Sequence, residues 1–246
     1  MALREELERS GNWLFRHRSY LPLVMLIPIL LALRDFHYPA GRHDLDLAWE
    51  MLCLAVGLAG LGIRALTVGF TPAGTSGRNT AGQVATSLNT RGMYALVRHP
   101  LYLGNYFMWL GPALFPRVWW VPVLLTLVFW LYYERIMFAE EEFLRRSFGA
   151  EYEEWAATVP AFLPHHLRWI RPALPFSVRN VLRREYSGFF GLMATFVILE
   201  IVSDYEATGS FRLDPIWAGI FAASLVIYLV LRTLKRQTRV LHVEGR

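Results

Sequence analysis

The sequence predicts an all-α, polytopic integral membrane protein with about six transmembrane helices. Of its 246 residues, 54% are hydrophobic and 15% are aromatic. The hydrophobic residues gather in long runs, which is unusual for a soluble domain of this length. Backbone groups inside a bilayer have no water to bond with, so each run must form a helix. Residues 1–246 are expected to form a single membrane domain.

Six apolar segments are candidates for crossing a bilayer, which takes about 20 helical residues. The first segment is short. Its basic flank and apolar run also resemble a signal peptide, but no small-x-small cleavage site follows. The third and fourth segments are joined by a turn that contains Pro116, so they are expected to form a helical hairpin. The segments cover residues 20–33, 47–70, 101–116, 118–138, 187–203 and 215–231.

The positive charges predict how the chain is oriented. With a cytosolic N-terminus and six spans, 19 lysine and arginine residues fall on the cytosolic side and four on the outer side. Such an excess marks the cytosolic face of a membrane protein. We therefore expect both termini in the cytosol, with a bacterial inner membrane favoured. Because the arginines flank apolar runs, the net charge of +5 indicates an anionic membrane surface rather than nucleic acid.

Two segments outside the spans are expected to be loops, and three polar residues within the spans are expected to have no catalytic role. Residues 71–92 are rich in Gly, Ser, Thr and Asn and predict a loop rather than a linker between domains. Residues 159–184 hold four prolines and predict irregular chain on the cytosolic surface. Cys53 is the only cysteine, so no disulfide can form within the chain and no cysteine-based metal site can be built. No metal-binding residues are expected. Glu50 and Glu200 are interpreted as structural or interfacial.

The first of two charged stretches leads into the third span. Pro100 suits the first turn of a helix, so Arg98 and His99 lie at a helix N-terminus, which favours anions. The Arg98 guanidinium adds affinity for a carboxylate or a phosphate. Gly104 would let a ligand approach the backbone closely. The alternative interpretation is a basic anchor at the start of a helix. Two nearby aromatic rings could pack on an adenine or a sulfonium, those of Tyr94 and Tyr102.

The second charged stretch follows the fourth span and begins with three glutamates at 140–142. Adjacent carboxylates repel one another, so some should pair with an arginine or a cationic ligand; the alternative is a solvated acidic helix start. Downstream apolar residues at helical spacing predict a helix in the plane of the interface. The hairpin brings both charged stretches to the same side of the membrane. Together they suit a zwitterionic ligand. The apolar residues are Leu144, Phe148, Tyr152 and Trp155.

Two strings in this order resemble the isoprenylcysteine carboxyl methyltransferase and phospholipid methyltransferase superfamily. They are Gly92-x-Tyr94-x-x-Val97-Arg98-His99-Pro100-x-Tyr102-x-Gly104 and Glu140-Glu141-x-x-Leu144-x-x-x-Phe148-Gly149-x-x-Tyr152. The resemblance covers residues 45–165 and leaves the helix pair in 187–231 outside the shared core. It implies a membrane enzyme that binds S-adenosylmethionine, with Glu141 holding the ammonium. The implied cofactor-binding residues are Tyr94, His99, Pro100, Tyr102, Gly104, Glu140 and Glu141.

The methyl acceptor is expected to be lipid-linked and anionic. Residues 76–105 also resemble the bacterial branch that methylates a lipid A phosphate; a prenylcysteine carboxylate would equally require arginine. Arg91 and Arg98 are the candidate catalytic residues, which would position the acceptor oxygen. Arg64 and Arg78 are candidates for substrate binding, although Arg64 could instead extend to the interface.

Two other functions stay open at this point. A phospholipid amine N-methyltransferase would need a base, for which Glu140 or His99 is available. A non-catalytic transporter or binding protein is the other alternative. Transporters carry ionisable residues at the membrane midplane, whereas here the polar groups gather at the cytosolic surface.

Overall fold

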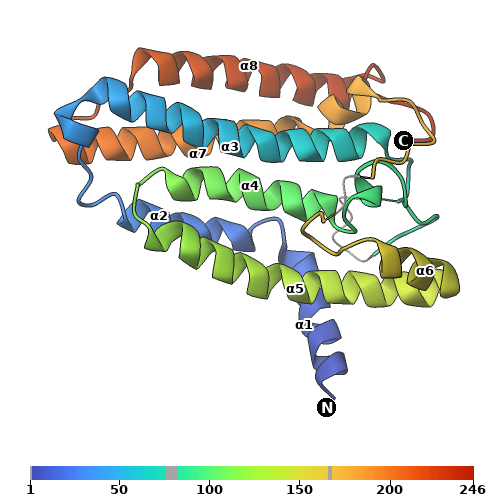
Figure 1. Ribbon diagram of the computed structural model, residues 1–246. Coiled ribbons are helices and arrows are strands. Elements are labelled where there is room, and N and C mark those ends of the chain that lie inside the picture. Colours follow the sequence, from blue (N-terminus) through green and yellow to red (C-terminus); the bar gives the residue numbers. More distant parts are fainter. Residues whose placement is uncertain (1, 76–82, 166–167) are drawn as a thin grey trace.

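The computed structural model describes residues 2–75, 83–165 and 168–246, and every regular element in these ranges is a helix. The all-α class is therefore confirmed. In Figure 1, α3 (His43–Phe70), α7 (Val178–Thr208) and α8 (Pro215–Gln237) form one side of the bundle. The hairpin of α4 (Pro100–Leu114) and α5 (Trp120–Phe148) forms the other side, and α4 packs against both α3 and α5.

Four helices in the described ranges, α3, α5, α7 and α8, are long and apolar enough to cross a bilayer. The protein is thus an integral membrane protein. The expected third span, α4, has only 15 residues. It is about 22 Å long, against about 30 Å of hydrocarbon. Its early end follows from Pro112 and Pro116, which cannot donate backbone hydrogen bonds.

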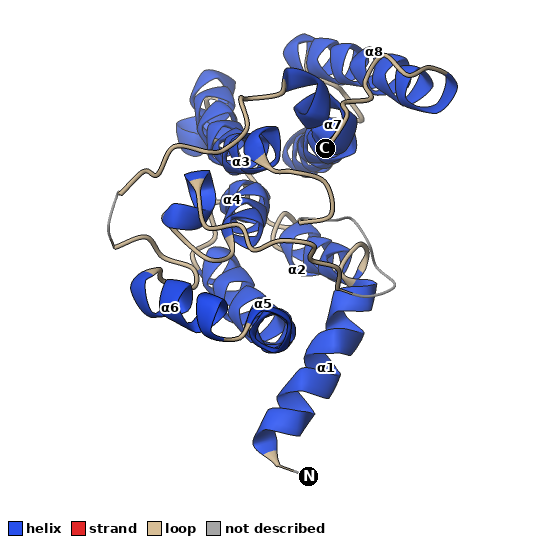
Figure 2. Ribbon diagram, turned by 90° about the vertical axis from the view of Figure 1, so that its right-hand side faces the viewer, coloured by secondary structure: helices blue, strands red, loops and turns tan. Residues whose placement is uncertain are grey.

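The expected first span is a broken element. Helix α1 (Leu3–His17) is followed by a 3₁₀ turn, η1 (Leu21–Met25), and a short helix, α2 (Leu26–Leu31). The chain bends by 83° between α1 and the apolar stretch Leu21–Leu31. Figure 2, which looks onto the end of the bundle where the loops gather, shows α1 extending away from the other helices. This pair adds at most a fifth span to the four long helices.

Glycines let α3 and α4 pack with their backbones in contact. A Cβ atom on Gly60 would lie 2.4 Å from the Gly104 carbonyl oxygen, and one on Gly111 would lie 2.5 Å from the Cys53 carbonyl oxygen. Small residues allow membrane helices to approach in this way. The resulting contact fixes the start of α4 beside the C-terminal half of α3.

Helix α7 begins nine residues before the expected span. The Ser177 hydroxyl accepts a hydrogen bond from the Asn180 backbone N–H, 3.3 Å away, which caps the new helix end. The Asn180 amide also donates to the Val68 carbonyl oxygen at 2.7 Å. The prediction of irregular chain to residue 184 is therefore wrong after residue 177. The correction matters because it places Glu185 on a helix packed against α3.

The expected interfacial helix is divided between two elements. Helix α5 ends at Phe148, and α6 (Ala150–Thr158) follows. Gly149 between them has φ +53°, a conformation that glycine adopts at no steric cost. The redirected chain brings α6 and the segment after it back over the start of α4.

Candidate active site

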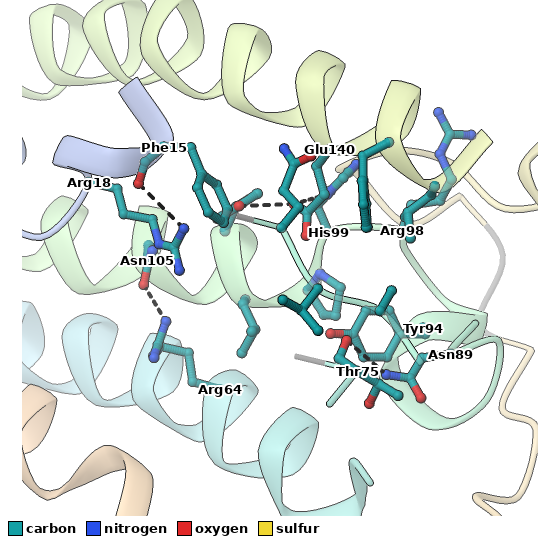
Figure 3. Close-up of a pocket in the computed structure, with 18 of the residues that line it drawn as sticks. Phe15, Arg18, Arg64, Thr75, Asn89, Tyr94, Arg98, His99, Asn105 and Glu140 are labelled. Atoms are coloured by element: carbon teal, nitrogen blue, oxygen red, sulfur yellow. Dashed lines mark hydrogen bonds and ion pairs between the residues drawn. The ribbon is translucent and has the colours of Figure 1, made fainter. Parts of the chain in front are cut away.

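A cavity of about 480 Å³ lies where the two charged stretches meet. This volume is typical of sites for small ligands and cofactors. Its walls come from the end of α1, the C-terminal half of α3, residues 83–89, the starts of α4 and α7, and the C-terminal half of α5. Figure 3 shows Arg64 and Asn105 on one wall and His99, Glu140 and Tyr94 on the other.

The backbone of the chain after α6 holds the Arg98–His99 turn. The backbone N–H of Arg98 donates to the Pro160 carbonyl oxygen at 2.8 Å, and that of His99 donates to the Ala161 carbonyl oxygen at 3.1 Å. Pro100 then occupies the first turn of α4, as predicted. Because both turn residues are fixed through their backbones, their side chains have defined directions.

Glu141 joins the two charged stretches directly. Its Oε1 atom lies 2.9 Å from Arg98 Nε and 2.9 Å from His99 Nε2. Arg98 Nη1 also donates to the carbonyl oxygens of Ala156 and Val159, each at 2.8 Å. Arg98 and His99 line the cavity, but Glu141 does not. The predicted meeting of the stretches is observed, with Glu141 behind the cavity wall.

Glu140 is the carboxylate that faces the cavity. Its Oε2 atom accepts a hydrogen bond from the Tyr102 hydroxyl at 2.9 Å and lies 3.6 Å from His99 Nδ1. One third of its side chain is exposed, and it lines the cavity. The Tyr102 ring also stacks on the His99 ring, with 5.6 Å between centroids. Glu140 is thus both oriented by its neighbours and accessible to a ligand.

The surroundings of His99 favour its protonated form. Burial lowers the pKa of the imidazole, but hydrogen bonds and charge attraction from Glu140 and Glu141 outweigh burial and raise the pKa above its ordinary value. A protonated imidazole donates from both nitrogens, which matches a carboxylate beside each one. His99 therefore acts as a cationic bridge between the two glutamates.

The third glutamate of the run is directed away from the cavity. Glu142 is buried and accepts hydrogen bonds from Arg4 of α1 and from Arg145. The expectation that the adjacent glutamates need cationic partners therefore holds, since each has a different set of partners. Glu142 joins α1 to α5. Glu140 lines the cavity, and Glu141 binds Arg98 and His99 behind the cavity wall.

Arg64 lines the cavity, and three hydrogen bonds hold its guanidinium. Its guanidinium donates to both carboxylate oxygens of Glu185, at 2.8 and 2.9 Å, and to the Asn105 side-chain oxygen at 2.6 Å. The Asn105 amide continues the network by donating to the Tyr133 hydroxyl at 3.0 Å. This network links α3, α4, α5 and α7 at one wall of the cavity.

The other predicted residues lie in different places. Tyr94 lines the cavity, and its carbonyl oxygen accepts a hydrogen bond from Trp155 Nε1 at 3.3 Å. Arg91 lines a second cavity of about 190 Å³, which shares Tyr94 with the first. Gly104 does not line the cavity; α3 fills the space beside it, and that packing accounts for the glycine without a ligand. Arg78 is outside the described residues.

Several residues of the cavity wall were not anticipated. Arg18 and Arg184 both line it, as do Asn105, Tyr133 and Glu185. The basic residues before the first span were used only to predict the orientation of the chain, so Arg18 was not recognised as a cavity residue. The capping serine at position 177 is the signal that could have placed Arg184 and Glu185 on a helix.

The wall combines groups of opposite charge with aromatic rings. Glu140 offers a partly exposed carboxylate beside Tyr102. Arg18, Arg64 and Arg184 supply positive charge elsewhere on the wall. Such a cavity suits a ligand that carries separate cationic and anionic groups.

Comparison with known proteins shows which family the chain belongs to. Residues 47–151 match the phospholipid methyltransferase family. The chain is 30% identical to the nickel-cobalt-cadmium resistance protein NccN of Alcaligenes xylosoxydans, over 62% of this chain and 67% of that protein. It is 33% identical to the cobalt-zinc-cadmium resistance protein CzcN of Cupriavidus metallidurans, over 62% of this chain and 66% of that protein.

A third relative carries an enzyme name. The chain is 37% identical to the protein-S-isoprenylcysteine O-methyltransferase of Schizosaccharomyces pombe, over 31% of this chain and 33% of that protein. No solved structure matches the chain significantly. The family match covers α3, α4 and α5, which supply much of the cavity wall. The chain belongs to the isoprenylcysteine carboxyl methyltransferase and phospholipid methyltransferase superfamily of membrane methyltransferases.

Proposed function

We propose that this protein transfers a methyl group from S-adenosylmethionine to an anionic, lipid-linked acceptor at the cytosolic face of a bacterial inner membrane. The observation that carries the proposal is the cavity itself, which has the volume of a cofactor site and is lined by Glu140, aromatic rings and several arginines. Both termini would then lie in the cytosol, as the distribution of arginines predicts.

The wall residues fit S-adenosylmethionine by charge and shape. Glu140 would accept the ammonium of the cofactor, and Tyr94 and Tyr102 would pack against its adenine or sulfonium. Arg18 and Arg184 on the wall would attract its carboxylate. Glu141 would act through Arg98 and His99, which differs from the direct ammonium contact that the family resemblance implies.

When bound, S-adenosylmethionine supplies an electrophilic methyl group that needs no further activation. The task of the protein is to align the acceptor and to exclude water. Arg64 and Arg98 are held by hydrogen bonds to Glu185 and Glu141, so their guanidinium groups do not reorganise when an anionic oxygen approaches. Arg91 and Arg78 remain candidates for the part of the acceptor outside the main cavity.

His99 is one of the two candidate bases that an amine acceptor would need, and its raised pKa favours the protonated imidazole. An amine must lose a proton during methylation, and a histidine that is already protonated cannot take it. An anionic oxygen, such as that of a lipid phosphate or a prenylcysteine carboxylate, needs only a cation to position it. The cationic wall supports the same choice.

Lipid mass spectrometry tests the acceptor. Lipids and lipid-anchored peptides would be extracted from cells that express the wild type or Glu140→Gln, and from cells without the gene. We expect one anionic species to gain the mass of a single methylene only with the wild type. A gain on an amine headgroup would instead identify a phospholipid N-methyltransferase. An unchanged profile, with no binding of cofactor by the purified protein, would indicate a non-catalytic membrane protein.

The names of the two bacterial relatives favour a second candidate function, a role in resistance to divalent metals. NccN and CzcN are named for it and match 62% of this chain. Growth of a deletion strain on nickel, cobalt, zinc or cadmium would test this role. If the wild type restores growth but Glu140→Gln does not, methyl transfer underlies the resistance; if both restore it, resistance is independent of the chemistry.

A further inference from the structure

The end of the bundle opposite the cavity buries an excess of negative charge. The N-terminal part of α3, the C-terminal part of α7 and the start of α8 converge there, as Figure 1 shows. Four carboxylates from these helices are each at most 6% exposed. Among the described residues, Arg117 is the one basic side chain that forms an ion pair with any of them, through Asp46. The four are Asp46, Glu50, Glu200 and Asp204.

Glu200 is the least satisfied member of this group. It is 1% exposed, and neither of its carboxylate oxygens accepts a hydrogen bond from a donor group in the described part of the chain. The Glu50 carboxyl lies within reach, but the two can share a hydrogen bond only if one of them is protonated. One Glu50 oxygen is equally unpartnered, and the other accepts a hydrogen bond from Trp217 Nε1 at 2.8 Å. A buried carboxylate without a partner is costly. The site therefore requires a cation or a proton.

The ligand geometry of a metal ion is present at the same place. One atom each from His43, Glu200 and Asp204 lies within 4.8 Å of the other two. A hydrogen bond orients one of these ligands, Asp204. The Tyr38 hydroxyl donates to Asp204 Oδ1 at 2.7 Å, which leaves the second oxygen for a metal. His43 Nε2 lies 3.9 Å from Asp214 Oδ2, which is an ion-pair distance and too long for a direct hydrogen bond.

We propose that His43, Glu200 and Asp204 bind a divalent transition-metal ion at the outer end of the bundle, separate from the methyl-transfer cavity. One imidazole and two carboxylates suit Zn²⁺, Co²⁺ or Ni²⁺. The ion offsets the charge of Glu200 and Glu50. It also ties the start of α3 to the end of α7. The side chain of His43 is 42% exposed, which gives a metal a route from solvent.

The sequence alone gave no sign of this site. His43 and Glu200 are 157 positions apart in the chain numbering, and neither stands in a metal-binding motif. Glu50 and Glu200, interpreted from the sequence as structural or interfacial, are instead the buried centre of the cluster.

Cobalt titration of purified protein tests the proposal. Tag-free protein in detergent would be stripped with a chelator and titrated with Co²⁺, with visible absorbance recording the ligand field and Zn²⁺ added as competitor. We expect one ion per chain, displaced by Zn²⁺, and a rise in melting temperature on binding. The variants Glu200→Gln, Asp204→Asn and His43→Ala should each weaken Co²⁺ binding at least ~10-fold.

A control substitution on α7 distinguishes the loss of a metal ligand from the loss of negative charge in general. Glu206 is exposed on α7, so Glu206→Gln should bind Co²⁺ as the wild type does. His43 is partly exposed, so His43→Ala tests the site even if the buried substitutions impair folding. Absence of Co²⁺ binding by the wild type would overturn the proposal and leave a proton shared between Glu50 and Glu200. Undiminished binding by His43→Ala and Asp204→Asn would overturn it as well.

Discussion

The adjacent residues Glu140 and Glu141 have different positions relative to the cavity. Glu140 faces it, whereas Glu141 lies behind the wall and is held by Arg98 and His99. The sequence could predict that the glutamates meet the Arg98–His99 turn, because the hairpin returns the chain to the same side. It could not predict which glutamate faces the ligand, since that depends on the rotation of α5 about its axis. That rotation is set by packing against α1 and α4.

We predict that Glu141→Gln mainly lowers stability. The substitution removes the charge that both Arg98 and His99 share, at an expected cost of about 1–3 kcal/mol in the free energy of unfolding. Glu140→Gln removes a more exposed carboxylate and should change stability less. Thermal unfolding of both variants in the same detergent measures the difference. If Glu140→Gln unfolded at the lower temperature, the assignment of the two positions would be reversed.

A second prediction concerns the pH dependence that His99 produces. Its pKa is raised in the folded protein above the ordinary value of 6.5. The stabilisation from its pairing is therefore complete below about pH 6.5 and is lost as the pH rises through the folded pKa. The difference in melting temperature between the wild type and His99→Gln should shrink as the pH is raised. A difference that stayed constant, or grew with pH, would mean that His99 is neutral in the fold.

At the scale of elements, the α3–α4 contact positions the cavity. Gly60 gives α3 a small surface, but the sequence alone does not say what covers it, because a glycine can admit either another helix or a ligand. The structure places α4 there, with Gly60 against Gly104. The sequence analysis placed the start of α7 too late. The prolines before it indicated irregular chain, and a capping serine is a weaker signal of a helix than an apolar run.

We predict that Gly60→Ala destabilises the protein by about 1–3 kcal/mol, because the new methyl group would overlap backbone atoms of α4. The matched control is Gly62→Ala on the same helix, where a Cβ would meet no atom within 4 Å. Thermal unfolding compares the two. Equal melting temperatures would show that α3 and α4 do not approach as closely as described.

At the scale of the whole molecule, the membrane class follows from composition, whereas the number of spans does not. Long apolar runs within a bilayer require helices, so composition and run length alone predict the class. Whether a short run such as α4 crosses the bilayer depends on its neighbours, and the expected first span is bent by 83° from the helix before it. The orientation of the chain stays a prediction from the distribution of arginines.

Labelling with a membrane-impermeant thiol reagent tests that orientation. In a background carrying Cys53→Ala, cysteine would be introduced by Ser210→Cys between α7 and α8, or by Thr238→Cys after α8. Arginine asymmetry predicts that intact cells are labelled at position 210 and that position 238 reacts only after lysis. The reverse pattern would invert the topology and move the cavity to the outer face.

Calorimetric titration with S-adenosylhomocysteine tests the central claim most directly. This demethylated product of the cofactor keeps its ammonium and carboxylate but has no methyl group to transfer. The account predicts that the wild type and the exposed control Glu134→Gln bind one molecule per chain, and that Glu140→Gln binds about tenfold more weakly or worse. No binding by the folded wild type, or equal binding by Glu140→Gln, would contradict the assignment of the cavity as the cofactor site.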